Sequence, residues 1–312
     1  MVREPFFIVG AERSGTTLLR LMLDGHGEIA CHPEFEFVVD LMKDDGSTPP
    51  IEEYGRFLAT NRIFQQSGRT IDRRLTYHEL VDGFLEDRRR RTGKRVVGAT
   101  VHRCFDRLLH LWPDARFIHL VRDGRDVARS RIARGWGGNA WSTSRFWLEA
   151  EVLWDQLRGR LPPERWRDVR YEELVCDPHA VLDETCRFLG VRWDGGMLDY
   201  TNRSDYGPPD PRLCFQWKEK LDKREIQRAE ARIGPMLENR RYALSGLPTI
   251  HVGLWMDRWL RAQNRIARYR ASVRKFGLRL QLAETVSRRL GMSRWHDDVQ
   301  RRIHAIANAQ LD

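Results

Sequence analysis

Cysteine is scarce in this chain, and its spacing excludes two kinds of site. The 312 residues include five cysteines, an odd number without a C-x-x-C pair, so the pattern fits neither a disulfide framework nor a zinc site. No apolar run is long enough to span a bilayer, and no basic segment followed by an apolar stretch indicates a signal peptide. We therefore expect a cytoplasmic protein with reduced thiols and no metal.

Acidic residues are outnumbered by basic ones, and this imbalance indicates the kind of ligand. The formal net charge is +10, which favours phosphorylated small molecules, nucleic acid or an acidic membrane surface. No recognisable nucleic-acid-binding motif is present, so nucleic acid is not expected as a partner. An apolar content of 41% is sufficient for a sizeable core.

Short apolar runs alternate with helical patterns along most of the chain. We predict strands at residues 6–9, 96–99, 116–121 and 166–171, and helices at 16–24, 104–112, 126–134 and 146–157. This alternation is typical of an α/β fold in which helices cover a central parallel sheet.

Two regions interrupt the alternation. Residues 44–94 are polar and end in the run EDRRRRTGKR, so they form either an insertion that shapes an acceptor pocket or an ordinary solvated helical excursion. In residues 201–215, proline and glycine disfavour regular structure, which indicates a long functional loop.

After residue 247 the pattern changes to long amphipathic helices, so we expect a domain at 1–247 and a helical C-terminal extension at 248–312. One helical face would carry the apolar residues Trp255, Trp259, Ala262, Ile266, Tyr269, Val273, Phe276 and Leu280. This extension could pack on the core, form a homodimer or make peripheral contact with an anionic membrane, and the first two are the simpler expectations.

The stretch FFIVGAERSGTTLLRLML lacks the lysine of a nucleotide-hydrolysing P-loop. Gly10, Gly15 and Thr17 match G-x-x-x-x-G-K-[ST], but Thr16 occupies the lysine position. Backbone N–H groups at the start of the following helix still favour an anion, and Arg13 adds a permanent charge. The loop therefore suits a single phosphate that carries a transferring group better than a magnesium-bridged triphosphate.

A second anion site is expected at the end of the strand at 116–121. Arg122 follows this strand, while Ser130 and Arg134 lie four residues apart on one face of the next helix. Ligands of open parallel sheets bind beyond the carboxyl ends of the strands. Together the two strand ends indicate a ligand with two separated phosphates.

These motifs resemble those of sulfotransferases that use 3′-phosphoadenosine 5′-phosphosulfate (PAPS). RSGTTLL resembles the 5′-phosphosulfate loop, VRDGRDVARS the 3′-phosphate segment, and VRYEELVCDP the segment that follows in the family. The likeness extends over residues 5–244 and is greatest to the tyrosylprotein and bacterial carbohydrate-type branches. It implies a P-loop-like three-layer α/β sandwich and an enzyme that transfers a sulfuryl group from PAPS to a hydroxyl, without a metal.

The resemblance also implies roles for individual residues. The 5′-phosphosulfate would be held by Arg13, Ser14, Gly15, Thr16, Thr17 and Leu18, and the 3′-phosphate by Arg122, Ser130 and Arg134. Tyr171 would contact the adenosine, and Arg13 would neutralise the leaving phosphate. For the catalytic base, Glu34 is preferred and His102 is the alternative, while Glu36 is an equally simple candidate to Glu34 on charge alone.

One departure from the family concerns a lysine near the strand at 96–99. This chain has Thr100-Val101-His102 there, so a cation expected near the sulfonate bridge is missing. Arg103 or a residue of the loop around 203–212 is a candidate replacement, and altered activity is the other outcome.

The acceptor is expected to be a small molecule, a carbohydrate or a glycolipid. Trp136, Trp141 and Trp147 are candidates to stack on it, although core packing suits Trp147 better. The competing hypotheses are a kinase-like or NTPase-like nucleotide-binding protein and a non-catalytic basic module that docks through the C-terminal arginines.

Overall fold

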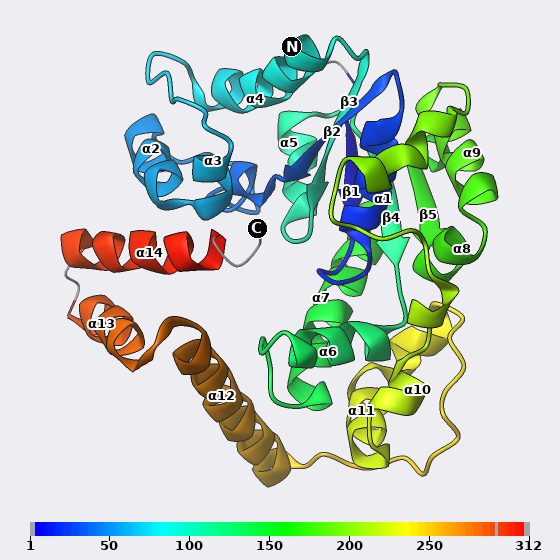
Figure 1. Ribbon diagram of the computed structural model, residues 1–312, viewed down its shortest axis with the longest axis vertical. Helices are drawn as coiled ribbons and strands as arrows, with labels where there is room; N and C mark the ends of the chain where they lie inside the picture. The colour runs from blue at the N-terminus through cyan, green and yellow to red at the C-terminus, as the bar shows by residue number, and fades with distance from the viewer. Residues whose placement is uncertain (1–3, 291–292, 309–312) are drawn as a thin grey trace.

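A five-stranded parallel sheet forms the centre of the molecule (Figure 1). The computed structural model describes residues 4–290 and 293–308. The strand order is β2-β3-β1-β4-β5, with bounds Ile29–Glu34, Val96–Val101, Phe6–Val9, Arg116–Val121 and Trp166–Arg170. The four predicted strands are confirmed, and β2 is a fifth that the sequence pattern did not predict. Its segment IACHPE has a short apolar run and contains Pro33, which lies where the register with β3 shifts.

Side chains alternate between two cores on the two faces of the sheet, which makes the fold a three-layer sandwich. On β1, Phe6 and Ile8 belong to one core and Phe7 and Val9 to the other. Residues of α1 (Thr16–Gly25), α8 (Tyr171–Cys176) and α9 (Pro178–Leu189) complete the first core. The second is completed from α4 (Tyr77–Thr92), α5 (Leu108–Leu111) and α7 (Ala140–Arg158).

Three helices beside the sheet differ from the prediction, and α7 differs in that it begins at Ala140 instead of residue 146. The helix expected at 104–112 is a 3₁₀ turn at Phe105–Arg107 followed by the short α5. Helix α6 (Gly124–Ala133) starts two residues earlier than expected because Asp123 caps it by accepting from the Arg125 N–H. Helices α10 (Trp217–Lys220) and α11 (Lys223–Asn239) follow the irregular segment at 201–215.

The region at 44–94 contains α2 (Ile51–Thr60), α3 (Arg62–Gln66) and α4. The hydroxyls of Tyr54 and Tyr77 donate to the carbonyls of Phe37 and Val38, which fastens the insertion to the chain after β2. The arginine run at the end of α4 is neutralised locally, since Arg88 pairs with Asp24, Arg89 and Arg90 with Glu86, and Arg91 with Asp87. Arg89, Arg90 and Arg91 are therefore those of a solvated helix end, whereas Arg88 is half-buried against Asp24 and the Cys31 carbonyl.

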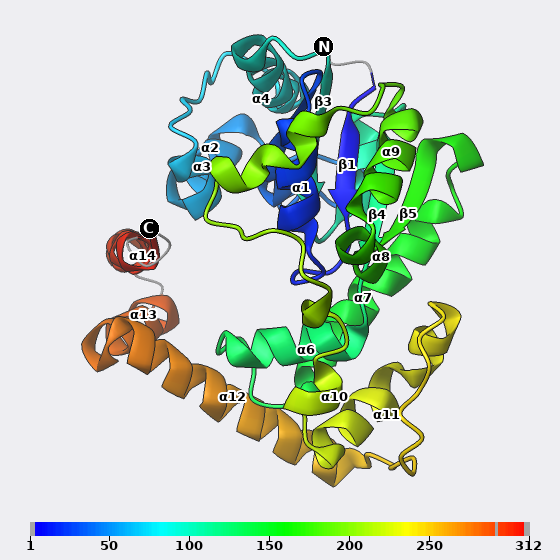
Figure 2. The same ribbon diagram turned by 45° about the vertical axis from the view of Figure 1, so that its right-hand side comes forward.

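The C-terminal extension forms an arm of three helices, α12 (Leu254–Phe276), α13 (Leu278–Arg289) and α14 (Ser293–Asn308). Figure 2 shows α12 running from below α6 toward α13, and α14 contacts α2. Helix α12 packs on the body through Leu260 and Ala267, not through the predicted apolar face: Trp255, Trp259 and Ile266 on that face stay exposed. Within residues 4–290 and 293–308, none of the helices combines the length and apolar character that crossing a bilayer requires.

Candidate functional site

Four strands end at, or directly before, a residue of the predicted site, and β1 ends directly before the first glycine of the predicted anion-binding loop. Glu34 is the last residue of β2, His102 follows β3, Gly10 follows β1, Arg122 follows β4 and Tyr171 follows β5. Because all five strands are parallel, these residues lie at one edge of the sheet. The strand order also divides the edge: β2 and β3 carry the carboxylate and the imidazole, and β1, β4 and β5 carry the anion-binding groups.

The loop between β1 and α1 is closed by two glycines that no other residue could replace without strain. Gly10 has φ 142°, and a Cβ there would lie 2.5 Å from the Leu120 carbonyl oxygen. Gly15 has φ 99°, and its Cβ would lie 2.3 Å from Cδ2 of Tyr171. The tight turn leaves the first N–H groups of α1 without helical partners at the mouth of the site, where they favour an anion.

Several arginines gather beside this loop, and two of them, Arg122 and Arg129, share the carboxylate of Asp126 at 3.6 and 3.8 Å. Arg13 donates from Nε to Oγ of Ser130 at 3.1 Å, and the Arg122 guanidinium lies 4.1 Å from the ring centroid of Tyr171. Burial, followed by the nearby charge of Arg134 and Arg122, lowers the pKa of Arg13. A bound anion would relieve this repulsion, so the cluster is arranged for a negatively charged ligand.

Several buried polar atoms at the site make no hydrogen bond among the described residues. They are Oγ of Ser14, Nε of Arg122 and Nε of Arg129, although the last lies in an ion pair 3.8 Å from Oδ1 of Asp126. Unpaired buried donors are costly, so their presence around one loop is physical evidence for a ligand with several acceptor oxygens.

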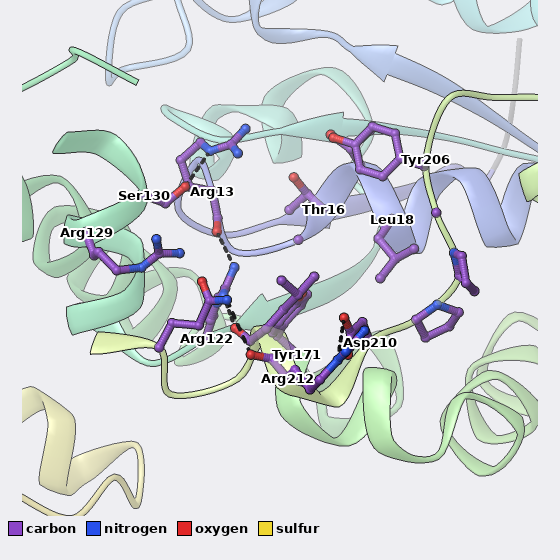
Figure 3. A pocket seen from close by; sticks show the side chains of 17 residues that line it. Arg13, Thr16, Leu18, Arg122, Arg129, Ser130, Tyr171, Tyr206, Asp210 and Arg212 are labelled. Atoms are coloured by element: carbon purple, nitrogen blue, oxygen red, sulfur yellow. Dashed lines mark hydrogen bonds and ion pairs between the residues drawn. The ribbon is translucent and has the colours of Figure 1, made fainter. Parts of the chain in front are cut away.

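A cavity of about 610 Å³ joins these groups, which is the size range of nucleotide and drug-sized ligands. Of the residues expected to bind the nucleotide, all but Ser14 and Arg134 line it. Ser14 is buried, and Arg134 is an exposed residue at the end of α6 that acts on Arg13 through its charge. Figure 3 shows the cations Arg13, Arg122 and Arg129 on the side of the cavity where α6 lies.

The irregular segment predicted at 201–215 forms the opposite wall. Residues 206–210, 212, 213 and 216 line the cavity, and Nη2 of Arg122 donates to the Leu213 carbonyl at 2.6 Å. Arg129 was missed because α6 carries arginines on several faces, and spacing alone does not tell which face the cavity. Arg125 illustrates the ambiguity: it is buried, pairs with Asp123 and lies 3.6 Å from the ring centroid of Trp217.

The acidic residues after β2 lie in two different environments. Glu34 is exposed at the strand end, and desolvation together with the charge of Glu36 raises its pKa. Glu36 is 2% exposed, and its Oε1 accepts from the backbone N–H of His102 at 3.0 Å and lies 2.5 Å from His102 Nδ1. Glu36 is therefore occupied by His102, and Glu34 is the carboxylate that remains open to an incoming molecule.

The structure brings His102 to the phosphate loop. Its Nε2 lies 2.9 Å from Oγ1 of Thr16, the residue that occupies the lysine position of the P-loop pattern. Arg103, expected as a replacement cation, turns away and binds both carboxylate oxygens of Asp40 at 2.8 Å. In the other suggested segment, Arg203 donates to the Gly196 carbonyl, and Arg212 lines the cavity while it pairs with Asp210.

The three tryptophans named as acceptor candidates have different surroundings. Trp147 is fully buried in a core with Ile233, which confirms core packing as its role. Trp141 donates to Asp257 and lies 3.8 Å from the Arg232 guanidinium. Trp136 is 41% exposed and lies 5.8 Å from the Arg13 guanidinium, so it is the tryptophan that could meet a ligand near the loop.

Known proteins similar to this chain agree with the geometry. Residues 5–195 match the Sulfotransferase family. Protein-tyrosine sulfotransferase A of Caenorhabditis elegans is 28% identical over 209 residues, covering 63% of this chain and 52% of that protein. The protein-tyrosine sulfotransferase of Drosophila melanogaster is 27% identical over 201 residues, covering 62% and 39%. The chain thus spans about half the length, or less, of these relatives.

Two solved structures share the fold. The sulfotransferase domain from the curacin biosynthetic pathway has a TM-score of 0.56 and 18% identity, covering 77% of this chain and 98% of that domain. The sulfotransferase domain from the Synechococcus PCC 7002 olefin synthase has a TM-score of 0.55 and 22% identity, covering 79% and 97%. With the family match over more than half of the chain and the expected P-loop-like sandwich, we conclude that this protein belongs to the Sulfotransferase family.

Proposed function

We propose that this protein transfers a sulfuryl group from PAPS to a hydroxyl of an acceptor. The observation that carries the proposal is that one cavity is lined both by the β1–α1 loop and by the cations after β4. A ligand with a phosphosulfate at one end and a phosphate at the other has anionic groups at the same two places. Membership of the Sulfotransferase family supports the same reaction.

PAPS would be held by arginine and backbone N–H groups at the two strand ends. We assign the 5′-phosphosulfate to Arg13 and to the loop and helix start at 14–18, and the 3′-phosphate to Arg122, Ser130 and Arg134. Arg122 and Arg129 share the single carboxylate of Asp126, and their Nε atoms make no hydrogen bond among the described residues. This supports the second assignment and adds Arg129 to it. Tyr171, which lines the cavity below the Arg122 guanidinium, would contact the adenosine.

The reaction needs a base on the acceptor side, and we assign this role to Glu34. The bond between sulfur and the bridging oxygen of the phosphosulfate breaks as the acceptor oxygen bonds to sulfur, and the acceptor proton passes to the Glu34 carboxylate. Desolvation raises the pKa of Glu34, which makes its carboxylate a better proton acceptor than an ordinary surface glutamate. Arg13 would neutralise the negative charge that grows on the leaving phosphate.

No metal is part of this proposal, because backbone N–H groups and arginines meet the phosphate charge. Among the described residues, no group of three or more His, Cys, Asp or Glu side chains is placed to hold a metal ion. We further propose a cytoplasmic location, supported by five cysteines that are all free.

For the acceptor we propose a hydroxyl of a small molecule, a carbohydrate or a glycolipid. The exposed ring of Trp136 near Arg13 is a surface on which a sugar or planar ring could stack. The relatives named above carry tyrosine-sulfotransferase names, so a tyrosine-containing peptide is the acceptor to test against this proposal.

For the C-terminal extension, residues 248–312, we propose peripheral binding to an anionic membrane through α12. Trp255 is 81% exposed, and Trp259, Ile266 and Tyr269 are also exposed. The same helix carries one acidic residue, Asp257, against the basic residues Arg258, Arg261, Arg265, Arg268, Arg270, Arg274 and Lys275. Aromatic residues beside a basic face suit an anionic lipid surface.

A vesicle experiment tests this extension separately from catalysis. Sedimentation with phosphatidylserine-containing vesicles should retain the wild-type protein and lose the Trp255→Ser/Trp259→Ser variant, while neutral vesicles retain neither. A homodimer interface would be identified instead by two results together. The wild type would bind no vesicles and sediment as a dimer in sedimentation velocity, and the variant would sediment as a monomer.

Turnover tests the main proposal. The protein, radiolabelled PAPS and panels of glycans, glycolipids, phenols and tyrosine peptides are incubated with EDTA present. Label transfer to one panel, abolished in Arg13→Ala and Arg122→Ala and retained in the surface control Arg145→Ala, is the expected result. Hydrolysis of ATP with magnesium and no affinity for PAPS would refute it in favour of an NTPase.

A further inference from the structure

A chain of three side chains links the buried region behind β2 and β3 to the phosphate loop. Glu36 Oε1 lies 2.5 Å from His102 Nδ1, and His102 Nε2 lies 2.9 Å from Thr16 Oγ1. The side chains of His102 and Glu36 are 7% and 3% exposed, and Thr16 lines the nucleotide cavity. His102 is not among the residues that line that cavity, so its hydrogen bond reaches a bound anion through Thr16.

The partners of His102 fix where its protons are. The ionised Glu36 carboxylate can only accept, so Nδ1 of His102 carries a hydrogen. Nε2 then either accepts from the Thr16 hydroxyl, if the ring is neutral, or donates to it, if the ring is an imidazolium. In the second case the hydroxyl hydrogen of Thr16 is free to be donated to a ligand in the cavity.

The charges that face His102 favour the imidazolium. Burial by itself would lower the pKa of His102, but the charge and hydrogen bond of Glu36 outweigh it and raise the pKa, with smaller contributions from Glu34 and Glu12. The same pairing lowers the pKa of Glu36 against the effect of its own burial, so both partners favour the ionised pair. Arg103 faces Glu36 and Arg62 faces Glu34, and Asp40 binds the Arg103 guanidinium.

We propose that the Glu36–His102 pair replaces the lysine missing from the loop: the His102 imidazolium donates to Thr16, which donates in turn to the phosphosulfate oxygens. This inference rests on the proposed function. It makes His102 a positioning and charge-supplying residue instead of the catalytic base, and it leaves the base to Glu34. No proton is transferred among Glu36, His102 and Thr16 during the reaction. The three side chains only strengthen a hydrogen bond to the charge that develops on the leaving phosphate.

The position of His102 directly after β3 explains how its side chain reaches the phosphate loop. A lysine in the loop would reach the phosphates from α1, whereas here the short Thr16 side chain leaves room for contact with the ring from the neighbouring strand. The register pairs Val9 of β1 with Val101 of β3, so the residue after each strand lies at the same level of the sheet edge. His102 and the loop after Val9 are therefore neighbours because β1 and β3 are paired in this register.

The test uses the alkaline limb of the pH profile for kcat/KM with PAPS. The wild type should lose activity as pH rises through the pKa of His102, because the neutral ring no longer donates to Thr16. His102→Lys should retain activity and move the alkaline limb to higher pH, since an ammonium replaces the imidazolium. His102→Leu, which supplies neither a hydrogen-bond donor nor a charge, should lose about 10²-fold of kcat/KM, the order found when one donor to developing oxyanion charge is removed.

Glu36→Gln and an NMR measurement separate this role from a merely structural one. Removal of the Glu36 charge should move the alkaline limb to lower pH, while His78→Gln, an exposed histidine of α4, should leave the profile unchanged. Ring ¹⁵N shifts of His102 in the full chain at neutral pH should be those of an imidazolium, irrespective of turnover.

The possible failures are distinguishable. Tight PAPS binding and turnover, together with a neutral His102 ring or an alkaline limb that neither variant moves, would overturn the inference and leave the proposed function standing. Inactive His102→Lys with normal PAPS affinity and a cooperative melting transition would also overturn it, since that result identifies the ring as the base. Absence of PAPS binding in the wild type at any pH would overturn both.

Discussion

Removal of Arg13 should affect the free protein and the nucleotide complex differently. In the free protein Arg13 makes one hydrogen bond to Ser130, worth about 1 kcal/mol, and it is repelled by Arg122 and Arg134. Arg13 has φ 78°, and alanine bears the same backbone strain as arginine there, so Arg13→Ala does not alter that cost. We expect the two contributions to offset, leaving the free energy of unfolding within about 1 kcal/mol of the wild type.

The nucleotide complex should lose much more free energy of binding than the free protein loses free energy of unfolding. Each hydrogen bond from a charged donor is worth about 1.5–3 kcal/mol, so nucleotide affinity should fall about 10- to 150-fold. At a nucleotide concentration 100 times the wild-type Kd, the wild type gains about 2.7 kcal/mol and a variant weakened about 100-fold gains about 0.4 kcal/mol. At roughly 2 °C per kcal/mol for a chain of this size, the ligand-induced Tm shift should fall from about 5 °C to about 1 °C.

Thermal denaturation with and without 3′,5′-adenosine bisphosphate measures both quantities on one sample. Arg145→Ala is the matched control, because it removes the same charge from an exposed pair with Glu149 on α7. A fall in the Tm of the free Arg13→Ala protein by more than about 5 °C, with an unchanged ligand-induced shift, would show that Arg13 is structural and refute the reasoning.

Three further predictions concern single residues. Glu34→Gln should abolish turnover while PAPS affinity is retained. Because the pKa of Glu34 is raised, the acid limb of kcat/KM for the wild type should lie at higher pH than for an ordinary glutamate. An active Glu34→Gln variant with an unchanged acid limb would exclude Glu34 as the base. Arg125→Ala should destabilise the fold by about 3–5 kcal/mol, measured by urea unfolding, because it leaves Asp123 and Glu230 without their buried cation; a loss below about 1 kcal/mol would contradict this. Gly15→Ala should weaken nucleotide binding through its clash with the Tyr171 ring, whereas Gly93→Ala, also at positive φ but in open space, should not; equal affinities in calorimetry would show that the loop adapts.

The sequence was sufficient for most of the fold because β1, β3 and β4 are buried on both faces along almost their whole length. Continuous apolar runs such as RFIHLV mark them, and β4 has the predicted bounds. The β2 strand was missed because it lies at the edge of the sheet and contains Pro33, so its apolar run is short. The apolar face of α12 was predicted by periodicity, but periodicity does not tell whether the body covers that face.

Site residues that directly follow a strand were predictable from the sequence. Site residues on helices and loops were less predictable, because spacing alone does not tell which side chains face the cavity. Arg122 and Tyr171 directly follow β4 and β5, and Arg13 lies in the short loop between β1 and α1. The pairing of His102 with Glu36 was not predictable, because the residues are 66 positions apart and meet only through β2–β3 pairing. The strand was predicted to end at residue 99, which placed Thr100 at the site, whereas β3 continues to Val101 and the first residue after it is His102.

The central claim is that the cavity binds an adenosine nucleotide with separate 5′ and 3′ anionic groups, without a metal. Calorimetric titration of the wild-type protein with 3′,5′-adenosine bisphosphate in EDTA tests it most directly. We predict saturable binding to one site, at least tenfold weaker for 5′-AMP, which lacks the 3′-phosphate, and weakened likewise by Arg122→Ala. Equal affinity for the two nucleotides, or binding only of ATP with magnesium, would contradict the account.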